Sequence, residues 1–253
     1  MKVPVINLQN EKTGEVEIPQ VFNTPVRHDV IRRAVIALQS TRFQPQGRDP
    51  MAGKHTTAES RGTGHGIARV PRLKGSSRAA FGVSIVGGHA AFPPRSEKVI
   101  VKRINKKERR FAIRSGIAAT AVKELVEKRG HKFESEHLPI VVSNEIQSLK
   151  KTKDVESLFI AIGVQDDVER ADRSKVRAGR GKMRGRKHKK GKGPLVVVAE
   201  DDGIGYAARN LPGVEICSVA GLNAELLAPG AHPGRLVIWT ESAFGQVDEV
   251  WER

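Results

Sequence analysis

From residue 194 onward the chain alternates strand-like and helix-like segments, and this alternation restricts the fold more than any other feature. Residues 194–200 (PLVVVAE) predict a strand and residues 203–211 (GIGYAARNL) a helix. Residues 214–219 (VEICSV) and 235–240 (RLVIWT) predict two further strands, each followed by a helical segment. Apolar strands separated by helices are typical of a parallel sheet covered on both faces. We therefore expect an α/β fold of three layers, doubly wound, with a mostly parallel sheet and helices on both faces.

The chain before residue 194 predicts elements that alternate less regularly. Helical periodicity runs over residues 105–130. It begins at Asn105, where Glu108 three residues later completes a variant of the capping box, and it ends at Gly130, a C-cap. A break in this helix is expected near Gly116 or Thr120. For the mixed-charge stretch of residues 164–173 the sequence predicts no element. The other predicted elements are a hairpin over residues 3–7 and 15–18, a helix over 26–41, a strand over 138–143, and short helices over 145–151 and 152–163.

All of the net charge lies in two segments of the chain. The formal net charge is +16. Residues 44–96 carry eight basic and two acidic side chains, and residues 175–193 carry ten basic and no acidic ones. The remaining chain has equal numbers of both signs, 26 of each. A neutral body with two charged segments points to a polyanionic partner that these segments contact.

Neither basic segment reads as part of a protein core. Residues 44–96 hold nine Gly and five Pro in 53 residues and show no sustained period, and unstructured loops of this length are usually functional or disordered. In residues 175–193 Gly alternates with Arg and Lys; glycine lets the backbone approach closely, arginine forks onto phosphate and lysine is a mobile point charge. A charge run is often only a solvated face, but the exclusion of acids favours phosphate contacts. The candidate contacts are Lys175, Arg177, Arg180, Lys182, Arg184, Arg186, Lys187, Lys189, Lys190 and Lys192.

RNA suits these segments better than DNA does. No helix of the chain has the pattern of a groove-reading element, and no dimer pattern is visible, whereas irregular RNA offers crevices for extended chain. Counterion release from many phosphates would drive the binding. We expect no DNA partner.

Catalytic, metal and cofactor signals are missing from the sequence. GTGHG (residues 62–66) neither follows a predicted strand nor opens a helix, and GIG (residues 203–205) comes directly after three acidic residues that would repel a phosphate. The histidines lack helical metal-site spacing, and the one cysteine excludes a disulfide framework. We expect no cofactor, no metal and no enzyme activity, and a soluble cytoplasmic protein without a membrane segment. The alternative is an RNA-modifying α/β enzyme with basic substrate-recruiting loops, which would need a pocket at the carboxyl ends of the strands.

Three stretches resemble a known family. Residues 61–115 (RGTGHGIARVPRLKG through RRFAIRS), residues 178–198 (AGRGKMRGRKHKKGKGPLVVV) and residues 210–244 (NLPGVEICSVAGLN through TESAF) are similar to the universal large-ribosomal-subunit protein four family. The second and third stretches resemble its archaeal and eukaryotic branch, and the length resembles the archaeal members. The resemblance covers essentially the whole chain.

This resemblance implies a structural constituent of the large ribosomal subunit. One globular α/β domain, residues 1–253, would carry a loop over 44–97 that penetrates large-subunit rRNA and a second rRNA-binding loop over 175–193. The protein would support assembly, form part of the wall of the polypeptide exit tunnel, and contact neighbouring large-subunit proteins and the nascent polypeptide. The implied rRNA contacts of the first loop are Arg48, Lys54, Arg61, Gly62, Gly64, His65, Arg69, Arg72, Lys74, Arg78, His89 and Arg95. The implied tunnel tip is Ile67, Ala68, Arg69, Val70, Pro71, Arg72, Leu73 and Lys74.

Overall fold

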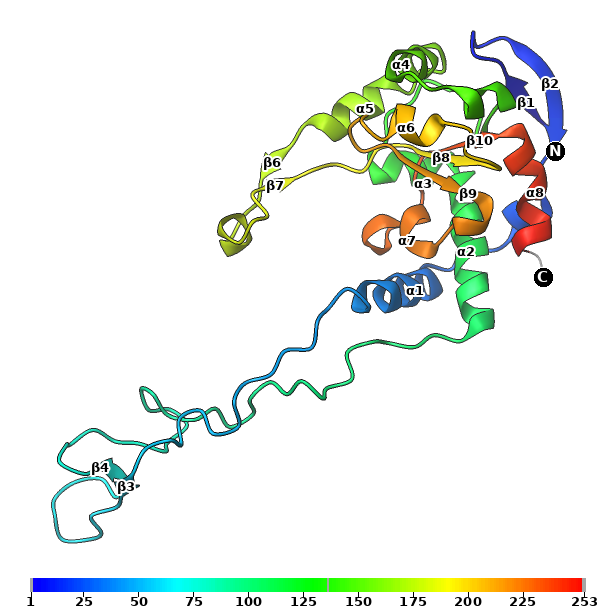
Figure 1. Cartoon of the computed structure of the whole chain (residues 1–253). Helices are drawn as coiled ribbons and strands as arrows, with labels where there is room; N and C mark the ends of the chain where they lie inside the picture. The colour runs from blue at the N-terminus through cyan, green and yellow to red at the C-terminus, as the bar shows by residue number, and fades with distance from the viewer. Residues whose placement is uncertain (1, 136, 252–253) are drawn as a thin grey trace. The chain divides into compact units, whose positions relative to one another are not determined.

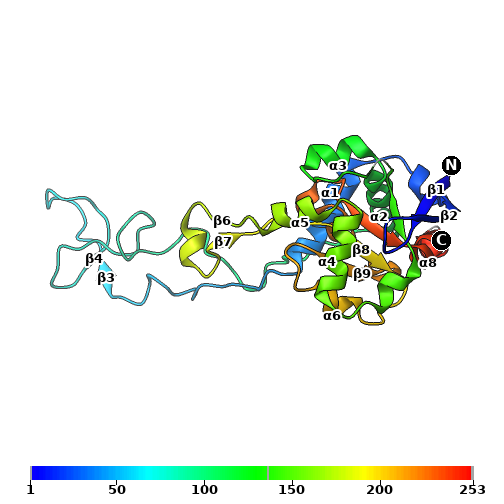
Figure 2. The ribbon, with the colours of Figure 1, turned by 90° about the horizontal axis from the view of Figure 1, so that it is seen from above.

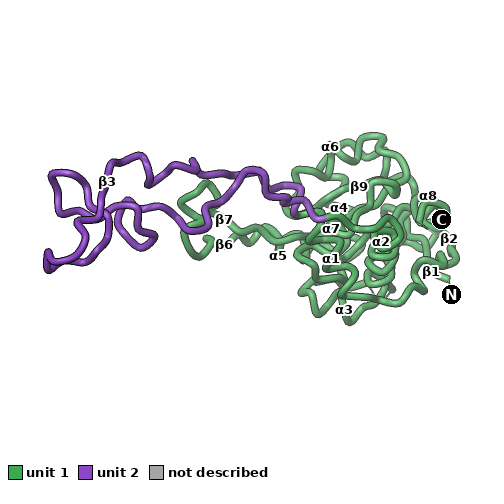
Figure 3. Tube along the Cα trace, turned by 90° about the horizontal axis from the view of Figure 1, so that it is seen from below, with its two compact units in different colours: residues 1–39, 103–253 green, residues 40–102 purple. Residues whose placement is uncertain are grey.

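The chain divides into two compact units in the computed structural model, which describes residues 2–135 and 137–251. Unit 1 comprises residues 1–39 and 103–253, and unit 2 comprises residues 40–102 (Figure 3). Unit 2 is thus an insertion between two parts of unit 1.

Unit 1 is built on a six-stranded sheet in the order β2-β1-β5-β10-β8-β9. Strands β1, β5, β10, β8 and β9 pair in parallel, and β2 pairs with β1 in antiparallel at one edge. The prediction of an α/β fold with a mostly parallel sheet is confirmed, as is the hairpin at the start of the chain. The strands are β1 (Lys2–Ile6), β2 (Lys12–Glu17), β5 (Ile140–Val142), β8 (Leu195–Val198), β9 (Glu215–Ser218) and β10 (Val237–Thr240).

Helices cover both faces of this sheet, because its central strands are apolar on both sides. Leu195 and Val197 of β8 belong to one buried cluster, and Val196 and Val198 to the other. Figure 1 shows α4 and α6 on one side of the sheet and α1 and α7 on the other. The first cluster is covered by α1 (His28–Ser40), α2 (Lys106–Thr120), α7 (Ala224–Leu227) and α8 (Glu241–Trp251), and the second by α3 (Lys123–Arg129), α4 (Thr152–Ala161), α5 (Gln165–Asp172) and α6 (Ile204–Ala208).

The helix predicted over residues 105–130 is two helices. It breaks after Thr120, one of the two expected places, whereas Gly116 lies inside α2 against Leu227, where an added Cβ would come within 3.2 Å of that side chain. Gly130 ends α3 with a φ of 95°, which confirms the predicted C-cap. The capping-box prediction is wrong: the Asn105 side chain makes no capping hydrogen bond, and Glu108 pairs instead with Arg33 of α1.

Two further boundaries differ from the sequence predictions. Residues 164–173, without an assigned element, form α5, whose buried side includes Asp167 as well as Val168 and Ala171. The segment predicted as a helix over 145–151 is a short 3-10 helix over Asn144–Ser148. In the first case a buried carboxylate hides the apolar periodicity.

Unit 2, all of whose residues the structure describes, contains two regular elements, the paired strands β3 (Ala58–Glu59) and β4 (Arg72–Leu73). Ala80 is the one apolar residue of the unit that is buried. Its two ends are joined by a 2.9 Å hydrogen bond from the backbone nitrogen of Lys102 to Oγ of Ser40. Further along, the chain crosses itself so closely that a Cβ on Gly53 would lie 2.5 Å from the carbonyl carbon of Gly88. Backbone contacts, rather than an apolar core, hold this unit together.

Among the residues that the structure describes, no helix is both long and apolar enough to span a lipid bilayer.

Candidate nucleic-acid interface

The second basic segment forms a hairpin in unit 1. We call residues 175–193 the basic hairpin. Strands β6 (Lys175–Val176) and β7 (His188–Lys189) pair in antiparallel, and a single 3-10 turn, Arg180–Met183, lies between them. The backbone nitrogen of Arg177 donates to the carbonyl of Lys187 at 2.8 Å, which extends the pairing toward the turn. Figure 2 shows the hairpin leading away from α5 and the sheet.

A buried arginine fixes the root of the basic hairpin to the sheet. Arg235 is fully buried, and its Nε donates to the carbonyl of Gly193 at 3.0 Å, at the end of the hairpin. Its Nη1 donates to Oε2 of Glu215 at 2.6 Å, and Glu215 also pairs with Lys192. Burial raises the pKa of Glu215, but the hydrogen bonds and charges of Lys192 and Arg235 outweigh it and lower the pKa overall. The ionised carboxylate therefore connects hairpin and sheet.

A second polar cluster joins α5 to the same root. Asp167 is fully buried and accepts hydrogen bonds from Nδ1 of His131 at 2.9 Å, from Nε of Arg170 at 2.8 Å and from the backbone nitrogen of Lys132 at 3.0 Å. Arg170 also donates from Nη2 to the carbonyl of Lys192 at 2.6 Å. Burial alone would raise the pKa of Asp167, but these bonds lower it overall, whereas burial lowers the pKa of His131. Asp167 is therefore held ionised and His131 neutral.

The predicted contact residues of the basic hairpin are available to a ligand. All ten are exposed except Arg177, which is half-buried because its Nε donates to the carbonyl of Arg186. Within the described part of the chain, Lys192 alone of the ten forms an ion pair. The other nine charges have no protein counter-ion to displace.

In unit 2 the predicted contacts are also mostly exposed. Arg72 and His89 are half-buried, and the remaining members of the predicted set are exposed. Both acidic residues of the stretch 44–96 are engaged: Asp49 accepts a 2.8 Å hydrogen bond from His55, which is the main cause of its lowered pKa, and Glu59 pairs with Lys74 at 3.4 Å. These two acids therefore offset a histidine and one lysine, and none of the predicted arginines forms an ion pair within the described residues.

The residues predicted as a tunnel tip lie around β4. Ala58 pairs with Leu73 and Glu59 with Arg72, so residues 60–71 form a loop closed by these strands. Residues 67–71 belong to that loop, and Arg72 and Leu73 to the strand. The Arg72 guanidinium donates to the carbonyl of Ser77 across the following turn. The predicted tip thus spans a loop and one strand.

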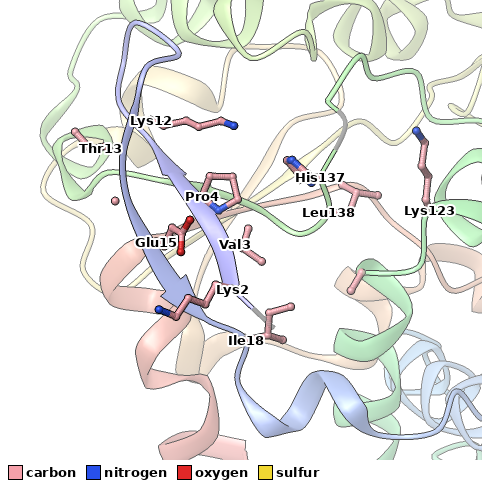
Figure 4. Close-up of a pocket in the computed structure, with 12 residues that line it drawn as sticks. Lys2, Val3, Pro4, Lys12, Thr13, Glu15, Ile18, Lys123, His137 and Leu138 are labelled. Atoms are coloured by element: carbon pink, nitrogen blue, oxygen red, sulfur yellow. The ribbon is translucent and has the colours of Figure 1, made fainter.

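The hollow beside β1 and β2 does not lie where the alternative function needs a substrate site. One hollow, of about 800 Å³, is lined by the hairpin β1–β2 and by Lys123, His137 and Leu138 (Figure 4). It lies at the amino-terminal half of β1, whereas parallel α/β enzymes bind substrates at the carboxyl ends of the strands. Among the described residues no group of three or more His, Cys, Asp or Glu is arranged to hold a metal ion.

The carboxyl ends of the strands have polar groups that bond to one another. Gln147 donates to Oγ1 of Thr240 at 3.2 Å and to Oγ of Ser242 at 2.9 Å, beyond the end of β10. After β8, Oδ1 of Asp201 accepts from the backbone nitrogens of Gly203 and Gly205, at 3.2 and 2.9 Å. These amides are the donors that a phosphate would need, so the interpretation of GIG as an ordinary turn with acidic capping is confirmed.

Sequence reasoning missed three cationic residues at the root of the basic hairpin. Lys128 and Arg129 lie in the last turn of α3 and Arg170 lies on α5. Basic residues in the last turn of a helix are common because they offset the helix dipole, so the sequence gives no signal that sets these apart. The fold brings them together with residues 189–192 around one cleft.

The comparisons with known proteins identify the family of the chain. The model of the ribosomal protein L4/L1 family matches residues 16–250. The large ribosomal subunit protein uL4 of Archaeoglobus fulgidus is 55% identical over 250 residues, which cover 98% of this chain and 99% of the relative. The large ribosomal subunit protein uL4 of Methanosphaera stadtmanae is 51% identical over 254 residues, covering 100% and 98%.

By its fold the chain is an α/β protein with a mostly parallel central sheet. It belongs to the ribosomal protein L4/L1 family, in its archaeal type.

Proposed function

We propose that the chain is a structural constituent of the large ribosomal subunit that binds large-subunit rRNA through residues 44–97 and the basic hairpin. The observation that carries this proposal is that the full net charge of +16 resides in residues 44–96 and the basic hairpin of a family member whose relatives are named as large-subunit proteins. Nine of the ten cationic side chains of the basic hairpin have no ion-pair partner among the described residues, so rRNA phosphates would be their counter-ions.

Residues 44–97 have a more specific role in this proposal. Residues 44–97 penetrate rRNA, and residues 67–74 form part of the wall of the exit tunnel, where the nascent polypeptide passes. The small buried apolar content of unit 2 supports this, because a segment with one buried apolar residue gains its order from a partner. Neighbouring large-subunit proteins contact unit 1 outside the basic hairpin, and the protein acts in the ribosome.

Sedimentation tests the proposal directly. The full chain should travel with large subunits through a gradient of moderate salt. A variant with all ten basic residues of 175–193 replaced by Ser should incorporate less well, and its loss should grow as salt is raised, since each neutralised phosphate contributes about 0.7–0.9 to the slope of log affinity against log salt. Equal incorporation of both proteins at high salt would remove the basic hairpin from the proposal.

A further inference from the structure

A basic cleft lies where the basic hairpin joins unit 1. It has a volume of about 920 Å³ and is lined by the end of α3, by α5, by residues 189–192 and by the segment around Pro229–Pro233. The lining precedes β8 and β10, so the cleft lies at the amino-terminal ends of the parallel strands. Its cationic lining residues are Lys128, Arg129, Arg170, Lys189, Lys190 and Lys192, and its acidic lining residue is Glu225.

Within the described residues, two of these six cations form ion pairs with carboxylates. Arg170 pairs with Asp167 and Lys192 with Glu215. Lys128, Lys189 and Lys190 are exposed and have no ion pair within the described residues. The cleft therefore keeps a positive potential that the fold does not cancel.

Arg129 is the most deeply placed of the uncompensated cations. Its Nη2 donates to the carbonyl of Pro229 at 2.9 Å and its Nη1 to the carbonyl of His232, so two neutral groups hold the guanidinium. Burial, together with the charges of Arg235 and Arg170, lowers the pKa of Arg129 to about 10. A half-buried cation beside two like charges is a position that an anion stabilises.

The wall of the cleft also contains one unsatisfied polar atom. The His131 side chain lines the cleft and is 1% exposed. Its Nδ1 is bonded to Asp167, and its buried Nε2 has no hydrogen-bond partner in the described structure. Buried polar atoms without a partner are rare in folded proteins. Because Nδ1 of the neutral ring donates to Asp167, Nε2 is an acceptor, which a hydroxyl such as that of a ribose satisfies and a phosphate oxygen does not.

We propose that this cleft binds backbone phosphates of folded RNA, with Arg129 as the half-buried anchor and Lys128 and Lys190 on either side. The inference rests on the proposed function, because residues 189–192 belong both to the cleft and to the basic hairpin. The volume fits a stretch of nucleotide backbone better than a single ion. Among the described residues no Phe, Tyr or Trp lines the cleft, whereas three histidines do, His28, His131 and His232. The cationic lining therefore favours contacts to phosphate, which position RNA without reading its sequence.

Charge-removing variants of the full chain test this site. Lys128→Gln with Lys190→Gln should lower affinity for a large-subunit rRNA transcript about tenfold or more and reduce the salt slope by about 1.4–1.8, as expected for two lost phosphate contacts. Both side chains are exposed, so the urea midpoint should stay that of the parent. Arg129→Lys keeps the charge and loses the fork, and should weaken binding while leaving the slope nearly unchanged. The matched control replaces two exposed lysines that do not line the cleft, Lys12→Gln with Lys153→Gln.

Amine labelling of the complex locates the contact. Lys128 lies on α3, outside the basic hairpin, and adding the rRNA transcript should protect it from acetylation while Lys153 stays reactive. The proposed RNA site in the cleft is wrong if the Lys128–Lys190 double variant binds like the control. It is also wrong if Lys128 stays reactive in the complex. If the parent chain fails to bind the transcript at all, the proposed function fails before the cleft is in question.

Discussion

The guanidinium of Arg235 donates from Nη1 to Oε2 of Glu215 at 2.6 Å, in a position where the arginine has no exposed surface. Three more of its bonds reach the carbonyls of Gly193, Pro194 and Leu226. Arg235→Met would leave these acceptors and the carboxylate without their donor. We expect a loss of about 3–5 kcal/mol in the free energy of unfolding, as for other broken buried pairs, measured by urea denaturation of the full chain. Arg209→Met, at an exposed arginine, should change it by less than about 0.5 kcal/mol; equal effects of the two would contradict the anchoring role.

The pair His131 and Asp167 makes stability depend on pH in a defined direction. The folded state lowers the pKa of His131, so below about 6.5 the unfolded chain takes up a proton that the folded chain refuses. Stability is therefore present above that pH and falls as the pH drops toward the folded-state pKa. Asp167 has the same sign at lower pH, because its folded-state pKa is also lowered. The urea midpoint of the parent should fall between pH 7 and pH 5.

His131→Asn isolates this effect, because an amide keeps a donor for Asp167 and does not titrate. We expect the variant to lose less of its urea midpoint than the parent over the same pH interval. A parent and a variant with parallel pH profiles would show that the pKa of the imidazole is the same in the folded and the unfolded chain.

Two glycine-to-alanine changes should act in opposite directions. Gly130 ends α3 with a φ of 95°, where an L side chain is strained, so Gly130→Ala should destabilise the protein by roughly 1 kcal/mol. Gly245 lies on the exposed side of α8, where an added Cβ meets no atom within 4 Å. Gly245→Ala should stabilise the protein by about 0.5–1 kcal/mol through helix propensity. Thermal unfolding of both variants is the measurement, and a shift of the same sign in both would be inconsistent with the assigned backbone geometry.

Deleting Met51–Ala91 should leave unit 1 folded. This stretch contributes one buried apolar residue, Ala80, and no strand of the main sheet. Circular dichroism and the urea midpoint should stay close to those of the full chain, while the salt dependence of rRNA binding becomes shallower because the stretch carries several of the basic residues. Loss of cooperative unfolding in the deletion variant would mean that unit 1 needs this stretch for its own stability.

The strands of the main sheet were predictable because a strand that is buried on both faces has a short, continuous run of apolar residues. Leu195–Val198 and Val237–Thr240 are fully buried, and no other element suits such runs between helices. Helix α5 was not predictable in this way. Asp167 takes an interior position there, and its burial depends on His131, 36 residues away, and on Arg170. A local pattern cannot reveal a buried carboxylate whose partner His131 is so distant in the sequence.

The residues of the candidate interface were likewise predictable only where they follow a local pattern in the sequence. The ten cations of the basic hairpin are contiguous in the sequence, so composition alone selects them. Lys128, Arg129 and Arg170 share no local pattern, and only the packing of α3 and α5 around the hairpin root places them at one cleft. Contiguous charge is predictable, whereas charge assembled by the fold is not.

The hydrogen bond between Ser40 and Lys102 closes the two ends of unit 2 on each other. Because loop-closure entropy grows slowly with length, ends that lie this close together tolerate a change in the number of residues between them at small entropic cost. The length of the segment between Ser40 and Lys102 is therefore one of the least constrained features of the chain.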